Sequence, residues 1–160
     1  MNLSQEDLVL VIWGPFASWV NTSVPEITAT FPRNTTLSIS FADGATGAWT
    51  AVYSDTQQVN GQLSNTWGEF TFSQTGVVDV SREVNMSGHP MRIVGPQCVS
   101  DMETCVFVCP SGENVCMYDY ILQNCEIGSQ TGANYGIHEG APSGGCGGLG
   151  TAASLKTTFY

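Results

Sequence analysis

Alternation of apolar and polar residues is the strongest pattern in this chain, and it predicts short β-strands rather than helices. The central part of the chain carries two alternating runs, which are separated by the loop Gln74-Thr75-Gly76. Phe70 and Phe72 share one face of the first run, and Val78 and Val80 share one face of the second. We therefore predict an antiparallel hairpin with Phe70 opposite Val80 and Phe72 opposite Val78, in which the loop glycine is free to adopt positive φ.

The polar face of this predicted hairpin carries paired acidic residues. Its members are Glu69, Thr71 and Ser73 on the first strand and Asp79, Ser81 and Glu83 on the second. In the predicted register Glu69 and Asp79 are diagonal neighbours, with Cβ atoms roughly 7–8 Å apart. Inverting glycosidases hold their two carboxyl groups about 6.5–9.5 Å apart. The same face is also typical of the solvent side of an ordinary antiparallel sheet, so both interpretations stay open.

Similar patterns predict strands on both sides of the hairpin. They lie at Leu8–Trp13, Glu26–Phe31, Thr35–Phe41, Ala48–Tyr53, Met91–Val94, Val106–Cys109 and Leu155–Tyr160. Polar residues predict a loop at Gln57–Asn65, and the six glycines of Gly140–Gly150 predict a loop fixed by its cysteine. Met117–Leu122 is the one segment that suggests a helical turn.

These elements predict a single all-β domain over residues 1–160, an antiparallel β-sandwich with a disulfide-rich, loop-dominated C-terminal region. Residues 1–97 supply the strands of the sandwich, residues 98–150 form the cysteine-rich loop region, and residues 151–160 supply a closing strand.

Net charge narrows the range of partners. The chain has 4 Lys and Arg against 14 Asp and Glu, which gives a net charge of −10. So few cations cannot neutralise a row of phosphates, which argues against nucleic acid and anionic membranes as partners. Carbohydrate or another protein remains a suitable partner. No motif indicates a cofactor or a metal site, and we expect a monomer.

Cysteines and glycosylation signals indicate a secreted, extracellular glycoprotein. The cysteines are Cys98, Cys105, Cys109, Cys116, Cys125 and Cys146. The Asn-x-Ser/Thr signals start at Asn2, Asn21, Asn34 and Asn85. Six grouped cysteines without any Cys-x-x-Cys spacing favour three disulfides over zinc, although their pairing is undetermined. A cytosolic protein with reduced thiols is the alternative.

Several short motifs occur in an order that resembles the thaumatin-like superfamily. They are Leu37-Ser-Ile-Ser-Phe, Asp43-Gly-Ala-Thr-Gly-Ala-Trp-Thr-Ala, Trp67-Gly-Glu-Phe-Thr-Phe, Val78-Asp-Val-Ser, Gly88-His-Pro-Met and Cys98-Val-Ser-Asp-Met-Glu-Thr-Cys. The Trp-Gly pair before Glu-Phe-Thr is similar to the related β-1,3-glucanases that release laminaripentaose. The resemblance covers about residues 35–109, and it implies a β-sandwich with an acidic cleft.

This resemblance implies roles for individual residues. Glu69 matches a cleft glutamate that acts as the acid in the glucanases, and Asp79 and Asp101 match cleft aspartates. Trp67 is the best candidate for stacking on a sugar, because an aromatic ring suits the apolar face of a pyranose.

The chain departs from the family at three cleft positions. Val52 replaces an arginine, Gly76 replaces an aspartate, and Asn85 occupies the place of the catalytic base of the glucanases. An amide cannot act as a general base, which leaves Glu83 as a possible substitute.

Three hypotheses follow. The first is a secreted, fungal, thaumatin-like protein that binds β-glucan or other cell-wall carbohydrate without efficient hydrolysis, through Glu69, Asp79, Asp101 and Trp67. The second is a weak endo-β-1,3-glucanase with Glu69 as the acid and Asp79 or Glu83 as the base. The third is a non-catalytic secreted effector that binds a host protein.

Overall fold

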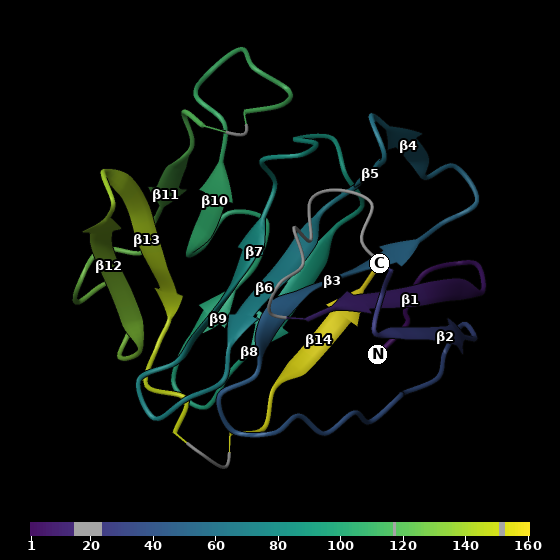
Figure 1. The fold of residues 1–160 in the computed structure, drawn as a ribbon, viewed down its shortest axis with the longest axis horizontal. Helices are drawn as coiled ribbons and strands as arrows, with labels where there is room; N and C mark the ends of the chain where they lie inside the picture. Colours follow the sequence, from purple (N-terminus) through teal and green to yellow (C-terminus); the bar gives the residue numbers. More distant parts are fainter. Residues whose placement is uncertain (15–23, 117, 151–152) are drawn as a thin grey trace.

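A computed structural model gives the fold, and it describes residues 1–14, 24–116, 118–150 and 153–160 (Figure 1). These residues form strands and no helix, so no helix in them is long and apolar enough to cross a membrane. The strands are β1 (Leu8–Trp13), β2 (Ile27–Phe31), β3 (Thr46–Val52), β4 (Gln57–Val59), β5 (Gln62–Ser64), β6 (Trp67–Thr71), β7 (Val77–Ser81), β8 (Met91–Val94), β9 (Val99–Ser100), β10 (Val106–Val108), β11 (Ile121–Gln123), β12 (Ala133–His138), β13 (Ala141–Cys146) and β14 (Lys156–Phe159).

Two sheets pack face to face around one main core. The large sheet has the order β11-β10-β7-β6-β3-β1-β2, with the β12–β13 hairpin attached to β7. Strands β14, β8 and β9 form the second sheet, and Ile93 and Phe159 from this sheet share a buried cluster with Leu10 and Trp49 from the large one. Among the described residues, all pairs of named strands are antiparallel except β7 with β10. The predicted all-β antiparallel sandwich is therefore confirmed.

The central hairpin forms between β6 and β7, but its register differs from the prediction by two residues. Phe70 lies opposite Val78, and Glu69 lies directly opposite Asp79. The apolar face is the one predicted, because a shift of two residues leaves every side chain on its own face.

Phe72 explains this shift, because it leaves the hairpin and pairs with the segment before β3. Its N–H donates to the carbonyl of Ala45 at 2.7 Å, and its own carbonyl accepts from the N–H of Gly44 at 2.6 Å. The loop of the hairpin is consequently longer than predicted, and the N–H of Gly76 donates to the carbonyl of Ser73 within it at 2.9 Å.

The cysteine-rich region contains more regular structure than predicted. The segment Gly140–Gly150 contains strand β13 rather than only a loop, and Ile121 and Leu122 lie in β11 rather than in a helical turn. Met117, the first residue of that predicted turn, lies outside the described residues. Strand β13 forms because Gly144 and Gly145 adopt φ values of 139° and 137°, which residues with a side chain rarely reach.

Two other predictions for the first half of the chain are wrong. Gln57–Asn65 contains the small hairpin β4–β5 rather than only a polar loop. Thr35–Phe41 alternates like a strand but belongs to no sheet, and residues 36–43, called the strap below, run across an edge of the sandwich. Ile39 and Phe41 of the strap pack against the main core whereas Leu37 is exposed, so the alternation supplies neither a uniform inward face nor a neighbouring strand.

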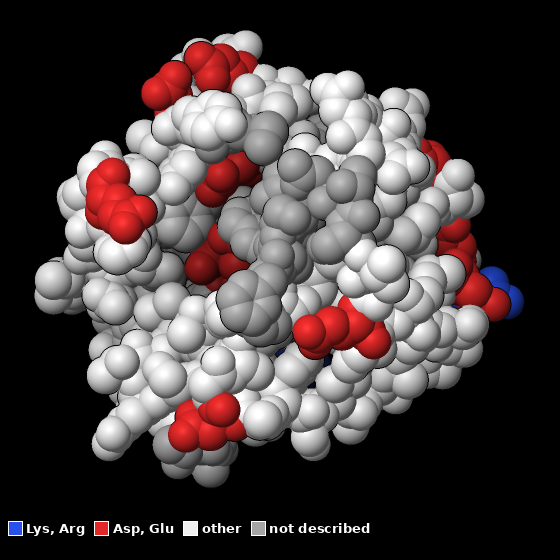
Figure 2. Space-filling model, in the orientation of Figure 1, with Lys and Arg blue, Asp and Glu red and all other residues white. Residues whose placement is uncertain are grey.

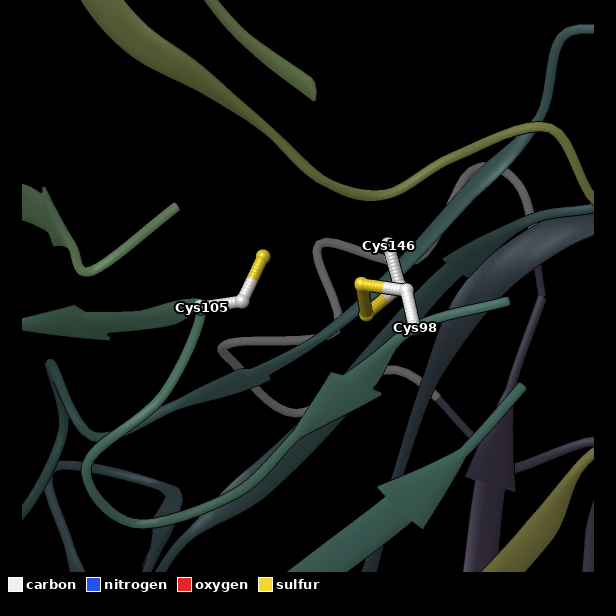
Figure 3. Close-up of side chains that lie close together, drawn as sticks. All are labelled: Cys98, Cys105 and Cys146. Atoms are coloured by element: carbon white, nitrogen blue, oxygen red, sulfur yellow. A yellow bond between two sulfur atoms is a disulfide. The ribbon is translucent and has the colours of Figure 1, made fainter. Parts of the chain in front are cut away.

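All six cysteines are paired, which confirms three disulfides: Cys98–Cys146, Cys105–Cys125 and Cys109–Cys116. Figure 3 shows Cys105 beside the Cys98–Cys146 bond. The sulfur atoms of these three residues lie within 4.8 Å of one another, the one such group of potential metal ligands in the described part of the chain. Because each sulfur is part of a disulfide, the group offers no thiolate to a metal ion.

Candidate functional site

A row of four residues crosses the outer face of the large sheet. Trp13 pairs with Ala48, Ala48 with Glu69, and Glu69 with Asp79. Because side chains alternate along a strand, this row lies on the face opposite the one where Trp49 enters the main core. The hairpin thus carries two carboxyl groups side by side on the face that the second sheet leaves uncovered.

Asp79 is buried by the backbone of the neighbouring strand β13. A Cβ atom added at Gly145 would lie 3.0 Å from the Cβ of Asp79 and 2.8 Å from the carbonyl oxygen of Val78. Asp79 is only 4% exposed, and its Oδ1 atom has no hydrogen-bond partner among the described residues. Burial, followed by the charges of Glu69 and Glu83, raises the pKa of Asp79 well above its ordinary value.

Glu69 lies between this aspartate and a small apolar cluster. The cluster includes Trp13, Ala48 and Trp67, and the two indole rings pack with their centroids 5.1 Å apart. Burial raises the pKa of Glu69 from 4.5 to about 7. A carboxyl group in this position retains its proton up to nearly neutral pH.

Glu83 completes what we call the acidic cluster, which consists of Glu69, Asp79 and Glu83. Burial and the charge of Glu69 raise the pKa of Glu83 to about 8, although a hydrogen bond with the side chain of Ser81 acts in the opposite direction. The structure thus brings Glu83, the possible substitute for Asn85, to the other two carboxyl groups.

Tyr120 is the residue of this site that the sequence did not indicate. Burial and then the charges of Glu83, Glu69 and Asp79 raise its pKa, which places its hydroxyl group in the field of all three carboxyl groups. Its ring packs edge-on against Phe107 of β10, with the ring centroids 5.5 Å apart. No local pattern could reveal Tyr120, because it lies in an irregular segment just before β11, which reaches the cluster through the pairing of β11 with β10 and of β10 with β7.

No ion pair with Lys or Arg compensates the acidic cluster within the described part of the chain. Arg92 faces Asp101 at 3.7 Å, and Arg82 donates to the carbonyl groups of Met86 and Met102. Figure 2 shows acidic atoms at the bottom of a hollow on the face seen in Figure 1. The site is therefore a group of largely buried carboxyl groups with raised pKa values.

Asp101 lies apart from this cluster. Its Oδ1 accepts hydrogen bonds from the N–H groups of Glu103 and Thr104, at 3.1 and 3.0 Å. Together with its contact to Arg92, these bonds give Asp101 a role in stabilising the β9–β10 loop. The structure does not support its predicted place in the cleft.

Trp67 does not occupy the surface position expected of a sugar-stacking residue, and Asn85 makes contacts that the sequence did not indicate. Trp67 is 2% exposed and donates from Nε1 to the carbonyl of Leu63 at 3.1 Å, so its ring is not offered to a sugar at the surface. Asn85 accepts from the N–H of Ser87 within a local turn and donates to the carbonyl of the distant Ser64, at the end of β5.

Comparisons of this chain with protein-family models, with curated proteins and with solved structures find no match. We therefore interpret the acidic cluster from its own chemistry. Buried carboxyl groups with raised pKa values are typical of sites that donate and accept protons or hydrogen bonds.

The asparagines predicted to carry glycans differ in how deeply they are buried. Asn2 is fully buried, and its Nδ2 donates to the carbonyl groups of Glu6 and Phe31, at 3.0 and 2.8 Å. A glycan on that nitrogen would break both hydrogen bonds, so the structure does not support the predicted glycan at Asn2. Asn34 is exposed, Asn85 is partly buried, and Asn21 lies outside the described residues.

We expect Asn34 to carry a glycan and Asn2 to carry none when the protein is made in a secretory host. The physical reason is access, because a glycan needs an amide nitrogen that is free and faces solvent. Enzymatic deglycosylation in heavy-oxygen water, followed by peptide mass spectrometry, marks each occupied site. Asn34→Gln should remove that glycan without unfolding the protein, and a glycan found on Asn2 in the folded protein would contradict the structure.

Proposed function

We propose that this protein is a secreted carbohydrate-binding protein that holds a neutral cell-wall polysaccharide of the β-glucan class in its acidic hollow. The observation that carries the proposal is the acidic cluster, which is recessed and lacks any pairing to Lys or Arg among the described residues. Carboxyl groups form strong hydrogen bonds with hydroxyl groups, and sugars present hydroxyl groups in rows.

Two further considerations support a neutral sugar. A net charge of −10 repels ligands that carry several phosphates or other rows of negative charge. The resemblance of the hairpin motifs to thaumatin-like proteins and their related β-1,3-glucanases favours β-glucan among neutral polysaccharides. The three disulfides and the exposed sequon at Asn34 are consistent with a secreted glycoprotein.

Hydrolysis of the same polysaccharide is a second candidate function, and the pKa values favour it. The pKa values of Glu69 and Glu83, about 7 and about 8, provide both protonated and ionised carboxyl groups near neutral pH. Glu69 and Asp79 are directly opposite, so their Cβ atoms lie about 4.5–5.5 Å apart rather than at a diagonal distance. That arrangement is closer to the carboxyl spacing of retaining glycosidases, about 5–5.5 Å, than to the inverting spacing.

The test is a pull-down on insoluble β-1,3-glucan with reducing sugar measured in the same tube, at about pH 5 and about pH 7. We expect the wild-type protein in the pellet. Glu69→Gln should bind about tenfold more weakly at about pH 7, because it removes a carboxyl group that is partly ionised there and forms strong hydrogen bonds. Glu126→Gln, a change at an exposed glutamate, is the matched control and should bind like the wild type.

The outcomes separate the candidate functions. Sugar release that disappears in Glu69→Gln would make the protein a glucanase, whereas binding without release would make it a lectin-like protein. Absence of wild-type protein from the pellet at both pH values would refute both, and would favour an effector whose partner is a host protein.

A further inference from the structure

A second cavity lies on the inner face of the large sheet, away from the acidic cluster. Its volume is about 600 Å³, which falls in the range of sites for small organic ligands. Leu10 and Ile12 of β1 and Trp49 of β3 form one wall, and Phe31 and Phe159 contribute aromatic rings. These side chains are on the face opposite Glu69, because Trp49 alternates along β3 with Ala48.

The strap, residues 36–43, covers this cavity. Leu37, Ile39 and Phe41 alternate along the strap, and all three line the cavity. Backbone hydrogen bonds fix the chain just before the strap, at Thr35, and just after it, at Gly44. Among the described residues no backbone hydrogen bond joins residues 36–41 to a sheet. Segments with few backbone hydrogen bonds open at low cost, so the strap can admit a ligand.

The apolar part of the lining indicates what kind of ligand fits. Ser38, Ser40 and Ser154 also line the cavity, so its wall is only in part apolar. Along the aliphatic and aromatic part, empty space costs free energy in proportion to its volume, and water gains few hydrogen bonds. An alkyl chain removes both costs, because it contacts the walls and needs no hydrogen bond.

The charged residues of the lining indicate the head group. Lys156 at the start of β14 is one of only four Lys and Arg residues in the chain, and it forms no ion pair within the described structure. Asp43, at the end of the strap, carries the one side-chain carboxylate among the described lining residues, and it disfavours a head group with several negative charges.

We propose that this cavity binds a long-chain fatty acid, with its alkyl chain between the strap and strands β1 and β3 and its carboxylate at Lys156. This site is separate from the acidic cluster, so the proposal stands whether or not the protein binds glucan.

The first test uses fluorescence quenching of the full-length protein by brominated palmitic acid. Trp49 lines the cavity, whereas Trp67 lies in the apolar cluster on the other face of the sheet. We expect saturable quenching that is largely lost in Trp49→Phe and retained in Trp67→Phe. Absence of saturable quenching in the wild type, or equal loss in both variants, would overturn the proposal.

The second test places a bulky side chain in the cavity and measures palmitate affinity by calorimetry. Ile39→Trp should weaken binding at least about tenfold, because the indole occupies the space of the alkyl chain. Thr30→Trp, on the exposed side of β2, is the matched control and should bind as the wild type does. A folded Ile39→Trp protein with wild-type affinity would refute the site.

The head-group assignment is tested with Lys156→Gln, which shortens the side chain by one atom, keeps it polar and removes its charge. We expect about fivefold weaker binding of palmitate and unchanged binding of hexadecanol. An equal effect on acid and alcohol would overturn the role of Lys156. This variant also keeps the proposal testable if Ile39→Trp fails to fold.

Discussion

Raising the pH from about 5 to about 8 is expected to destabilise this protein markedly, because the folded state holds protons on the acidic cluster that the unfolded chain releases. The pKa of Glu69 is raised from 4.5 to about 7 and that of Glu83 to about 8, so the native state binds more protons than the unfolded state across this interval. Stability must then fall as pH rises.

The size of the effect follows from the pKa values. The change at Glu69 alone corresponds to roughly 3 kcal/mol, which is a decrease in Tm of about 6–12 °C for a protein of this length. The stability that these groups contribute is fully present below about pH 4.5 and is lost by about pH 8. Asp55, whose pKa is lowered mainly by its hydrogen bond with His89, acts at lower pH and lies outside this interval.

Asp79→Asn isolates the cause. An amide has nearly the shape of a protonated carboxyl group and never ionises, so this variant should melt at a higher temperature than the wild type at about pH 8 and change little at about pH 5. Asp43→Asn, at an exposed aspartate, serves as the control and should follow the wild type. Thermal unfolding by circular dichroism measures all three proteins. A wild-type Tm that stays level or rises across this interval would show that the cluster is not desolvated.

Removing the Cys98–Cys146 disulfide should destabilise the protein more than removing Cys109–Cys116. The first bond joins residues 48 apart in sequence and the second joins residues 7 apart, so the first restricts the unfolded chain more. In the chain-entropy description the corresponding costs are about 4 and about 2.5 kcal/mol. Urea unfolding of the two double Cys→Ala variants measures the difference. Equal costs, or a larger cost for the short loop, would contradict this description.

The Cys98–Cys146 bond also bears on the site. Cys146 is the residue of β13 that pairs with Val78 of β7, and the neighbouring Gly145 covers Asp79. Loss of this disulfide should therefore admit water to Asp79 and reduce the pH dependence of stability. The same variant thus tests whether β13 is the cause of the burial of Asp79.

The sequence by itself determined which residues form most of the sandwich strands and which face each side chain takes. Leu8–Trp13 and Met91–Val94 are strands with the predicted bounds, because the apolar residues that they bury form runs that are visible in the local sequence. Alternation likewise placed Glu69 and Asp79 on one face, since the period of a strand is two residues. The number of disulfides also followed from the even count of grouped cysteines.

Only the tertiary structure decided which residues and strands pack against these strand faces. The direct pairing of Glu69 with Asp79 depends on Phe72 bonding to Ala45 instead of continuing the hairpin, which is a contact between distant residues. The burial of Asp79 depends on β13. Its glycines make the sequence of this strand resemble a loop, and two of them adopt positive φ values in the structure. The local sequence predicts which side chains of a strand point toward the core. The register of the strands, the choice of neighbouring strand and the desolvation of the carboxyl groups depend on contacts between segments that lie far apart in the chain.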